Sequence, residues 1–565
     1  MTRRITPKAP RSHPFYLSRS QPSRVTTQQS HNPTESQSNR VTTQQSHNPT
    51  ESESMPHTVS ISVDRYLKKS LFLIFSGWMF LSCSTHTGEA VAGEAEPANR
   101  HAQEPAARIT AAINVDFPDE SSLSAIYELF SEYDREDAPG CAVAVYRNGE
   151  MAHSATFGMA NLDYGIPLTD SSRFYMASVS KQVTAAAAAL LVVRGELGYD
   201  AAVSDYLDEW PEWASEVRVK HLFNHTSGLP DIYDLMDISG ISLSNVMDLD
   251  DYMALFYRGE SLKNSPGTSY SYTNSGYTTL AKLVEAVSGK RFSEFVESEL
   301  LEPLGMTATH FHDDRLRVIP NRVISYAPVD DETIEADEEG GSDEKPSDAA
   351  SPAFRQTYLS NFQGVGPGGL YSSLKDWKHW ESFWMGTSMM PYDLNELRTM
   401  MTRREVIRND TLAYALGLDV ETWQGVRMEG HTGNFMGFKT DVRRFPQHGL
   451  ALLTLCNRED ANPGRKNREM AKILLQGVFE AFLAPYQGTY HNEELLVDYE
   501  LTVEDGSLKL IRRLSPRGVM DEEAHDKWRA GSWDFVFQRD EEGQVTGFLV
   551  STGRAREVEF VRKAP

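Results

Sequence analysis

The chain has 565 residues, which is too long for one ordinary domain, and 40% of them are hydrophobic, enough for a sizeable core. Its 55 Lys and Arg residues against 80 Asp and Glu residues give a formal net charge of −25, which argues against a nucleic-acid partner, because phosphates require basic side chains. The three cysteines, Cys83, Cys141 and Cys456, lack C-x-x-C spacing, so the sequence supports neither a thiolate zinc site nor a redox motif.

The N-terminal 54 residues are rich in Ser, Thr, Gln, Asn and Pro, and the string RVTTQQSHNPTES occurs twice, beginning at Arg24 and at Arg40. Such a composition offers too few apolar side chains to form a core. We therefore expect residues 1–54 to be disordered, and to lie outside the translated protein if Met55 is the true start.

A hydrophobic segment follows Met55. Three basic residues precede an apolar run at 71–81, which at 11 residues is too short for a membrane-spanning helix. Residues 55–83 are therefore predicted to be a signal peptide. The end of the run, from Phe80 to Cys83, resembles the lipobox of bacterial lipoproteins, with Phe80 in place of the usual Leu, and implies lipidation of Cys83. An ordinary signal-peptide cysteine is the alternative. We expect an exported protein of the periplasm or cell envelope, anchored through Cys83 and a linker at 84–112.

Patterns typical of folded sequence begin near residue 113. Apolar residues at helical spacing predict an amphipathic helix over 123–133. Strands are predicted at residues 141–146, 437–445 and 450–456. Most of the sequence between them has helical periodicity, so strands near both ends enclose a helical middle and the architecture is mixed. From residue 486, short alternating runs separated by turns predict a small all-β domain.

The string Ser178-Val179-Ser180-Lys181 carries the first chemical signal. It precedes an Ala-rich stretch without Pro or Gly, residues 182–193, which predicts a buried helix with Ser178 at its N-terminus. Positions i and i+3 share a helix face, so the Lys181 amine can reach the Ser178 hydroxyl. Burial can lower the lysine pKa, and a neutral amine can then take the serine proton.

The same S-x-x-K spacing occurs twice more, beginning at Ser342 and at Ser372. Ser342 lies in residues 330–348, where ten acidic residues and a single lysine predict a solvated loop. Ser372 follows a glycine cluster, and no apolar helix follows its lysine. Context therefore selects Ser178 as the nucleophile and Lys181 as its base.

Two further motifs follow along the chain. Tyr272-Thr273-Asn274 stands just before a predicted helix, and His431-Thr432-Gly433 stands before the strand at 437–445. Y-x-N also occurs at Tyr146, where the predicted strand at 141–146 enters a hairpin turn, and at Tyr490, in the C-terminal β region. A lone histidine in a Thr-Gly turn is more often structural than functional, so neither motif is specific by itself.

In this order, the three motifs resemble the serine β-lactamase and D-alanyl-D-alanine carboxypeptidase superfamily, closest to the class C-like branch that also contains esterases and D-aminopeptidases. Supporting strings are His225-Thr226-Ser227-Gly228-Leu229-Pro230 and Gly368-Gly369-Leu370-Tyr371-Ser372-Ser373. The likeness spans about residues 117–482. The C-terminal region resembles the lipocalin-like domain that is appended to some members.

The resemblance implies an α/β sandwich. An antiparallel sheet built from both chain ends is flanked by helices and lies beside an all-helical subdomain, with the active site between them. The hydrolase domain is expected over residues 113–485, and a small barrel-like, lipocalin-like domain over 486–565.

The same resemblance implies the roles of the site residues. Ser178 is the nucleophile, Lys181 the general base and Tyr272 a second proton carrier. The substrate-binding residues that it implies are Asn274, His431, Thr432, Gly433 and Asn434. The backbone N–H groups of Ser178 and Asn434 would form an oxyanion hole. His431 stands where many relatives have a lysine, and a histidine is largely uncharged at neutral pH, so we expect a poor β-lactamase.

The expected reaction is acyl transfer from an amide, lactam or ester through an acyl-enzyme on Ser178. The partner is a small-molecule or peptide substrate, such as a cell-wall peptide or a β-lactam, and the resemblance implies no metal or cofactor. One alternative is a carboxylesterase without a cell-wall role. The other is a penicillin-binding sensor lipoprotein that acylates and does not turn over.

The resemblance also places Cys141 and Cys456, which begin and end predicted strands, near each other in one sheet. An oxidising compartment would permit a disulfide between them. Cross-strand pairs seldom meet disulfide geometry, so two buried free thiols are expected.

Overall fold

The computed structural model describes residues 118–243, 245–329, 353–357, 361, 363–388, 394–512 and 515–564. These residues all belong to one compact unit, Glu104–Pro565. The predicted disordered segment, signal peptide and linker lie outside the described residues, as do Cys83 and the acidic run around Ser342.

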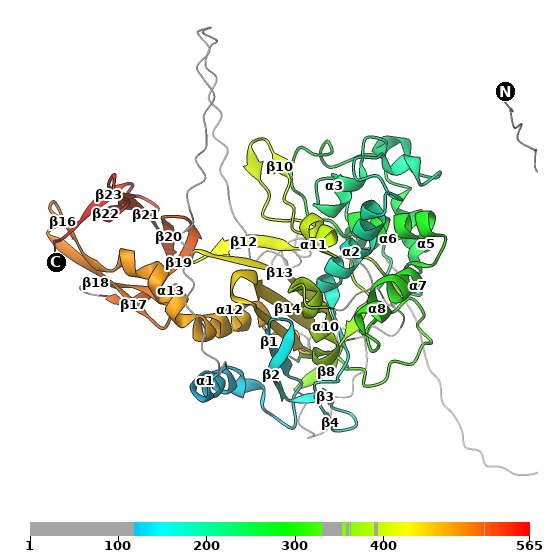
Figure 1. The fold of residues 1–565 in the computed structure, drawn as a ribbon, viewed down its shortest axis with the longest axis horizontal. Helices are drawn as coiled ribbons and strands as arrows, with labels where there is room; N and C mark the ends of the chain where they lie inside the picture. Colours follow the sequence, from blue (N-terminus) through cyan, green and yellow to red (C-terminus); the bar gives the residue numbers. More distant parts are fainter. Residues whose placement is uncertain are drawn as a thin grey trace, which may run out of the picture. The chain divides into compact units, whose positions relative to one another are not determined.

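A six-stranded antiparallel sheet forms the centre of the region for which a hydrolase domain is expected, residues 113–485 (Figure 1). Its strands, in spatial order, are β12 (Asp419–Trp423), β13 (Val426–Phe435), β14 (Phe438–Phe445), β15 (Leu450–Cys456), β1 (Cys141–Arg147) and β2 (Glu150–Phe157). The predicted strands are confirmed, and the pairing of β1 with β15 joins the two ends of this region. Both strands are buried along almost their whole length, which explains why they read as continuous apolar runs.

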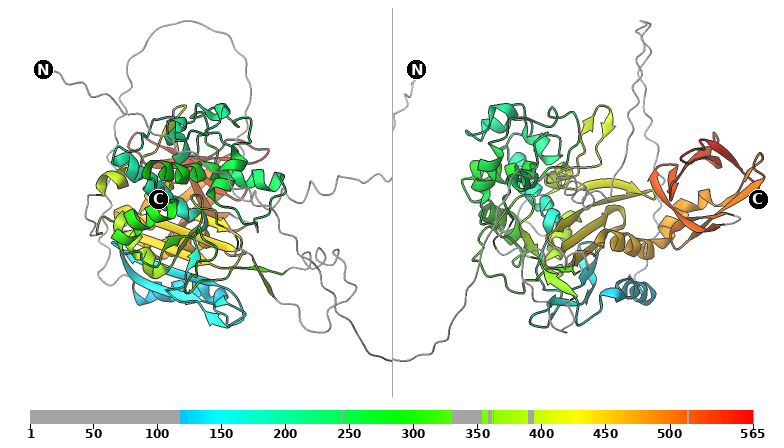
Figure 2. Two further views of the ribbon diagram at one scale, coloured as in Figure 1. Left: turned by 90° about the vertical axis from the view of Figure 1, so that its right-hand side faces the viewer. Right: turned by 180° about the vertical axis from the view of Figure 1, so that it is seen from behind.

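Helices cover one face of the sheet and continue into a helical subdomain (Figures 1 and 2). At its centre α2 (Lys181–Val193) packs against α6 (Asn274–Ser288) and α11 (Asn395–Met401). Every α2 residue up to Leu191 is buried, as the Ala-rich sequence predicts, because small side chains let neighbouring helices approach closely. On the same side, α10 (Leu374–Trp384) packs against β1 and β2.

The opposite face of the sheet is covered by α12 (Pro463–Leu474), which packs on β14 and β15 and contacts α1 (Glu120–Phe130). Apolar side chains of α1, α12, β1 and β15 form one buried cluster. Helices therefore enclose the sheet on both faces, and the predicted α/β sandwich is confirmed.

The remaining elements of this region are short. The other helices are α3 (Val219–Phe223), α4 (Ile232–Ile238), α5 (Leu249–Phe256), α7 (Phe292–Val296), α8 (Glu302–Leu304) and α13 (Gln476–Leu483). Single helical turns are η2 (Ser131–Tyr133), η3 (Ala177–Ser180), η4 (Val203–Asp205), η5 (Glu212–Ala214), η6 (Glu297–Leu301), η7 (Pro446–His448) and η8 (Ala484–Tyr486). The small paired strands are β3 (Met159–Asn161) with β4 (Ile166–Pro167), β5 (Phe174–Tyr175) and β6 (His310–Phe311) with β9 (Leu370–Ser372), β7 (Tyr326–Pro328) with β8 (Phe354–Gln356), and β10 (Val406–Ile407) with β11 (Asp410–Thr411).

Cys141 and Cys456 form a disulfide, so the expectation of two free thiols is wrong. The two residues stand directly opposite each other where β1 pairs with β15, and their Cα atoms are 4.1 Å apart. Directly opposite residues in an antiparallel pair are the closest cross-strand neighbours, so the register brings the two sulfur atoms within bonding reach. The disulfide is therefore a covalent link between two strands at the centre of the sheet.

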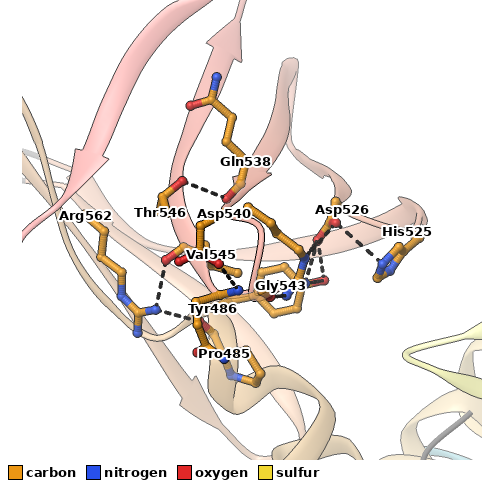
Figure 3. A network of polar contacts seen from close by, with 12 residues as sticks. Pro485, Tyr486, His525, Asp526, Gln538, Asp540, Gly543, Val545, Thr546 and Arg562 are labelled. Carbon is orange, nitrogen blue, oxygen red and sulfur yellow. Dashed lines mark hydrogen bonds and ion pairs between the residues drawn. The ribbon is translucent and has the colours of Figure 1, made fainter. Parts of the chain in front are cut away.

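The C-terminal region is a closed antiparallel barrel, as the alternating runs predict. Its strands are β16 (Gly488–Asn492), β17 (Val497–Glu504), β18 (Ser507–Arg512), β19 (Ser515–Ala524), β20 (Lys527–Ala530), β21 (Trp533–Arg539), β22 (Val545–Ser551) and β23 (Val558–Arg562). Large buried side chains, among them Trp528 and Phe548, fill its core. Figure 3 shows Arg562, which links the segment just before the first barrel strand to β22. Its guanidinium donates to Pro485 O at 3.1 Å and to Val545 O at 3.2 Å.

Tyr486 and Asp526 form a second polar contact in Figure 3, where the tyrosine hydroxyl donates to the carboxylate at 2.9 Å. Arg539 donates to the same carboxylate at 2.7 Å. The barrel is thus stabilised by packing in its core and by polar contacts where the chain enters it, around residues 485–486.

Within the described ranges, no helix is long and apolar enough to cross a membrane.

Candidate active site

Ser178 lies on the short turn η3, and α2 begins only at Lys181, so the serine precedes the long helix instead of opening it. The strand β5 leads into this turn. Ala177 has a φ of 47°, a region that residues with a side chain rarely adopt. The Met176 N–H donates to Leu370 O at 2.8 Å and fixes the approach of the chain. Ser178 itself is half-buried, so its hydroxyl remains within reach of a substrate.

The Lys181 amine is fully buried and makes three polar contacts. Its Nζ lies 3.0 Å from Ser178 Oγ, 2.9 Å from Asn274 Oδ1 and 3.0 Å from Pro367 O. Burial lowers the pKa of Lys181 to about 7, and the Asp231 carboxylate opposes this shift. The predicted lowering of the lysine pKa is therefore found, and its cause is desolvation.

The contacts also define where the lone pair of the neutral amine points. The two carbonyl oxygens, Asn274 Oδ1 and Pro367 O, can only accept hydrogen bonds, so they take the two N–H groups. In the neutral amine, the lone pair of Lys181 is then left facing Ser178 Oγ, 3.0 Å away, and can accept the serine proton. This is the geometry that a general base requires.

Asp231 fixes the orientation of Asn274. Its carboxylate accepts from the Asn274 backbone N–H at 2.5 Å and from Nδ2 at 3.0 Å, so the amide oxygen must face Lys181. Asp231 also caps α4 by accepting from the Tyr233 N–H at 2.9 Å. The sequence interpretation missed Asp231, although it directly follows the supporting string that ends at Pro230.

The glycine cluster at 366–369 supplies the Pro367 carbonyl. Gly366 has a φ of 101°, and a side chain there would collide with Tyr277 O. The Thr184 hydroxyl donates to Gly366 O at 2.7 Å and ties the cluster to α2. The sequence analysis used this cluster as context for Ser372 and as part of a family signature, and missed its role at the lysine.

Within the described part of the chain, the competing matches at Ser372, Tyr146 and Tyr490 do not form a second site. Ser372 is fully buried and its Oγ lies 2.8 Å from Thr309 Oγ1, while the lysine three residues on is exposed. The Tyr146 hydroxyl donates to Leu374 O, and Tyr490 lies in the core of the barrel. Ser342 lies outside the described residues.

Tyr272 approaches the nucleophile from the other side. Lys181 Nζ lies 4.9 Å from the centre of its ring. Burial of the hydroxyl raises the pKa of the phenol well above its usual value, and the neighbouring Ser178 hydroxyl opposes that shift, although 38% of the residue as a whole is exposed. A neutral phenol can relay a proton, so Tyr272 has the position of the predicted second proton carrier.

His431 is held by two protein partners. Its Nδ1 donates to Thr432 O at 2.6 Å, so Nε2 is the acceptor for the Tyr414 hydroxyl at 3.0 Å. Burial and, to a lesser degree, the nearby Lys181 charge lower the pKa of His431 to about 3. The residue is therefore uncharged at neutral pH, in agreement with the expectation. No motif indicated Tyr414, yet its hydroxyl is hydrogen-bonded to Nε2 of His431, the nitrogen that a substrate group would otherwise contact.

The strand β13 brings the His-Thr-Gly motif beside the nucleophile. A Cβ atom at Gly433 would lie 2.7 Å from Met176 O and 3.0 Å from the Ala177 side chain, so only glycine allows this approach. The Thr440 hydroxyl also donates to Met176 O, at 2.9 Å. Asn434 follows Gly433 directly, so the structure brings together the two segments that carry the predicted oxyanion hole.

Among the described residues, no cluster of His, Cys, Asp and Glu could hold a metal ion. The side chains that converge on Ser178 are an amine, a phenol and a carboxamide, which suit proton transfer and hydrogen bonding. A profile described as "Beta-lactamase" matches residues 126–476, more than half of the chain. The chain belongs to the β-lactamase family.

Curated relatives of this β-lactamase family member include Penicillin-binding protein 4* of Bacillus subtilis, 26% identical over 347 residues, which cover 60% of this chain and 72% of the relative. D-aminopeptidase of Brucella canis is 28% identical over 322 residues, and the alignment spans 57% of each chain. The matched region is thus little more than half of that D-aminopeptidase. The family match and these relatives make the chain a serine hydrolase.

Solved structures share the fold. The octameric penicillin-binding protein homologue from Pyrococcus abyssi has a TM-score of 0.52 at 18% identity, over 78% of this chain and 99% of that chain. D-amino acid amidase from Ochrobactrum anthropi SV3, complexed with L-phenylalanine, has a TM-score of 0.50 at 22% identity, over 64% of this chain and 99% of that chain. At these identities the likeness establishes the architecture alone.

Proposed function

We propose that the protein hydrolyses amides and peptides of D-amino acids through an acyl-enzyme on Ser178. The observation that carries the proposal is the 3.0 Å contact between Ser178 Oγ and the amine of Lys181, whose pKa is lowered to about 7. A neutral amine at this distance activates the hydroxyl at physiological pH. The D-aminopeptidase relative supports the substrate class, over the 57% of its length that is matched.

In the acylation step, Ser178 Oγ attacks the carbonyl carbon and its proton passes to Lys181 Nζ. The tetrahedral oxyanion is stabilised by the backbone N–H groups of Ser178 and Asn434. The C–N bond then breaks, and the proton moves through Lys181 and Tyr272 to the leaving amine. In deacylation, water attacks the ester, gives its proton to the same relay, and releases the acid with Ser178 restored.

The test is intact mass spectrometry after exposure to a D-alanyl dipeptide, a nitrophenyl ester and a fluorescent penicillin. We expect a transient acyl adduct and turnover of the dipeptide, and neither in Ser178→Ala. Ser342→Ala is the matched control, because it removes a serine with the same S-x-x-K spacing in the acidic run, and it should retain both. Undiminished turnover by Ser178→Ala would remove the proposal.

The same experiment separates the other activities. Turnover of the ester without turnover of the dipeptide would favour a carboxylesterase. A penicillin adduct that persists without product would favour a sensor that acylates and does not deacylate. Only dipeptide turnover through Ser178 supports the proposed reaction.

We also propose that the protein is exported and lipid-anchored through Cys83, in the periplasm or cell envelope. The short apolar run after Met55 and the lipobox-like ending at Cys83 support this proposal. The disulfide between Cys141 and Cys456 adds to it, because such bonds persist in oxidising compartments and are rare in the cytosol.

A further inference from the structure

The strand β13 has an open edge beside the nucleophile. On one side, β12 pairs with β13 only from Val426 to Gly430. From His431 to Phe435, the described pairing of β13 is with β14 on the other side. The open stretch includes Gly433, which lies against the turn that carries Ser178. An extended substrate can add to such an edge as a further strand.

Asp419 stands at the end of this open edge. It is the first residue of β12 and pairs with Gly430, immediately before His431. Arg443 of β14 pairs with Gly430 from the other side, so both side chains lie on the same face of the sheet. Because Gly430 has no side chain between them, Asp419 Oδ2 and Arg443 Nη1 face each other, at 4.0 Å. The Asp419 side chain keeps 33% of its surface exposed.

The charges around Asp419 leave an excess of carboxylate. Arg443 is engaged by Asp441, at 2.8 Å from Nη2 and 3.1 Å from Nε. Arg468 is paired with Glu421 at 3.8 Å. Asp419 is left with its 4.0 Å contact to an arginine that Asp441 already holds closely. Burial raises the pKa of Asp419 to about 7, Arg443 opposes the shift, and Glu421 and Asp441 add to it.

Asp419 is linked to the catalytic site through Tyr414, with which it forms an antiparallel β-bridge. The Tyr414 hydroxyl is hydrogen-bonded to His431, and its ring centre lies 6.0 Å from that of Tyr270 and 6.3 Å from that of Tyr272. Tyr270 and Tyr272 are 44% and 38% exposed, so their rings are accessible to a ligand. A carboxylate beside exposed tyrosine rings is a good environment for an ammonium group, because aromatic faces attract cations.

The position along β13 indicates which half of the substrate reaches Asp419. The oxyanion hole is assigned to Asn434, and Tyr272 must reach the leaving amine to protonate it. The rings of Tyr272 and His431 are 6.2 Å apart, so the leaving group lies on the His431 side of the scissile bond, towards Asp419. Asp419 pairs with Gly430, four residues before Asn434. The Arg443 guanidinium that Asp419 faces reaches further along the strand and donates to Thr432 at 2.8 Å, two residues before Asn434. Two residues of an extended chain span about 6–7 Å.

We infer that Asp419 binds a positively charged group on the leaving half of the substrate, two to four residues along β13 from the scissile carbonyl. This inference rests on the proposed function and specifies its substrate class. A free carboxylate at the same place would meet Asp419 and Asp441, and it would find no cation at His431, which is neutral. The site therefore selects an ammonium group. A lysine at the position of His431 would instead favour a carboxylate.

The test uses N-acetyl-D-alanine amides of three leaving amines with matched chain length. Putrescine carries an ammonium at its far end, pentylamine a methyl group and δ-aminovalerate a carboxylate. For the wild type, we expect kcat/KM to be highest for the putrescine amide, by about tenfold or more over the pentylamine amide, and lowest for the carboxylate, since one charge-assisted hydrogen bond is worth about 1.5–3 kcal/mol.

Two variants locate the effect at Asp419. In Asp419→Asn, the ratio of kcat/KM for the putrescine amide over the pentylamine amide should fall to about one, whereas Asp419→Glu should keep a ratio well above one. Glu421→Gln is the matched control, because it removes a carboxylate from the same strand that Arg468 already engages, and it should keep the wild-type ratio.

The outcomes separate this inference from the proposed function. Hydrolysis of all three amides at equal kcat/KM by the wild type would overturn the role of Asp419 and leave the proposed function intact. An unchanged preference in Asp419→Asn would do the same. Absence of hydrolysis of every amide by the wild type would overturn both.

Discussion

The Lys181 amine contacts a hydroxyl and two carbonyl oxygens, and none of these groups carries a full negative charge. No anion in direct contact therefore offsets the loss of hydration that an ammonium suffers on burial. Asp231 opposes the shift, but its carboxylate is engaged by Asn274. One residue thus combines a fixed position with a pKa close to neutral, which is what a general base needs.

We expect kcat/KM for an uncharged amide to rise with pH and to reach half its maximum near pH 7, because only the neutral Lys181 amine accepts the Ser178 proton. Burial holds the pKa values of His225 and His431 far below 7, so neither accounts for this midpoint. Since the pKa of Asp419 is also raised to about 7, the midpoint should be measured in Asp419→Asn as well, where it should persist.

Two lysine variants complete this measurement. Lys181→Arg should lose at least about 100-fold in kcat/KM, because a guanidinium stays protonated and cannot act as the base. Lys375→Arg is the control, because Lys375 is the exposed lysine of a competing S-x-x-K string, and it should keep the wild-type profile. A midpoint near pH 10 in the wild type would contradict the lowered pKa of Lys181, and an unchanged kcat/KM in Lys181→Arg would contradict the assignment of the base.

At the scale of elements, the pairing of β1 with β15 closes the hydrolase region. The disulfide between Cys141 and Cys456 joins residues 315 positions apart, so it restricts nearly the whole of this region in the unfolded chain. Removing both thiols, as Cys141→Ala with Cys456→Ala, should lower the free energy of unfolding by about 2–5 kcal/mol. Guanidinium denaturation, followed by tryptophan fluorescence, measures this loss.

Peptide mapping provides the control for the disulfide. When the non-reduced protein is denatured and alkylated, neither Cys141 nor Cys456 should take up the reagent, whereas both should after reduction. Cys83→Ala lacks the third cysteine and should show the same stability and the same protection of the other two. Alkylation of Cys141 and Cys456 without reduction would show that the bond is not formed in the protein.

At the scale of the whole molecule, the hydrolase region and the barrel are preceded by the segment that the sequence assigns to export. A chain that begins at Met55 should reach the membrane fraction as efficiently as the full chain, because residues 55–83 hold the predicted signal and lipidation site. Cys83→Ala should release the protein into a soluble fraction, since the lipid anchor depends on that thiol. Cell fractionation with immunoblotting checks both results, and unchanged membrane retention of Cys83→Ala would mean that Cys83 is not the anchor.

The local pattern of the sequence was sufficient for the elements that carry the chemistry. The apolar runs predicted β1, β14 and β15, and the Ala-rich stretch after Lys181 predicted α2, because burial on all sides leaves a continuous hydrophobic signal. Motif spacing also indicated Ser178 and Lys181, since residues three positions apart lie on one side of a helical turn.

Tertiary structure alone decided what each of these side chains meets. Asp231, Tyr414 and Pro367 come from segments far from Lys181 in sequence, and a hydrogen bond formed through folding leaves no periodic trace in the chain. The disulfide depends on a strand register that places Cys141 opposite Cys456, and a shift of one residue would have separated the thiols onto opposite faces. The sequence by itself indicated Ser178 and Lys181 as candidates for acyl transfer, because the spacing of the two residues is local information. Only the packing of distant segments decided the pKa of Lys181 and the groups that contact it and Ser178. The reason is that desolvation and electrostatic interactions depend on distance in space.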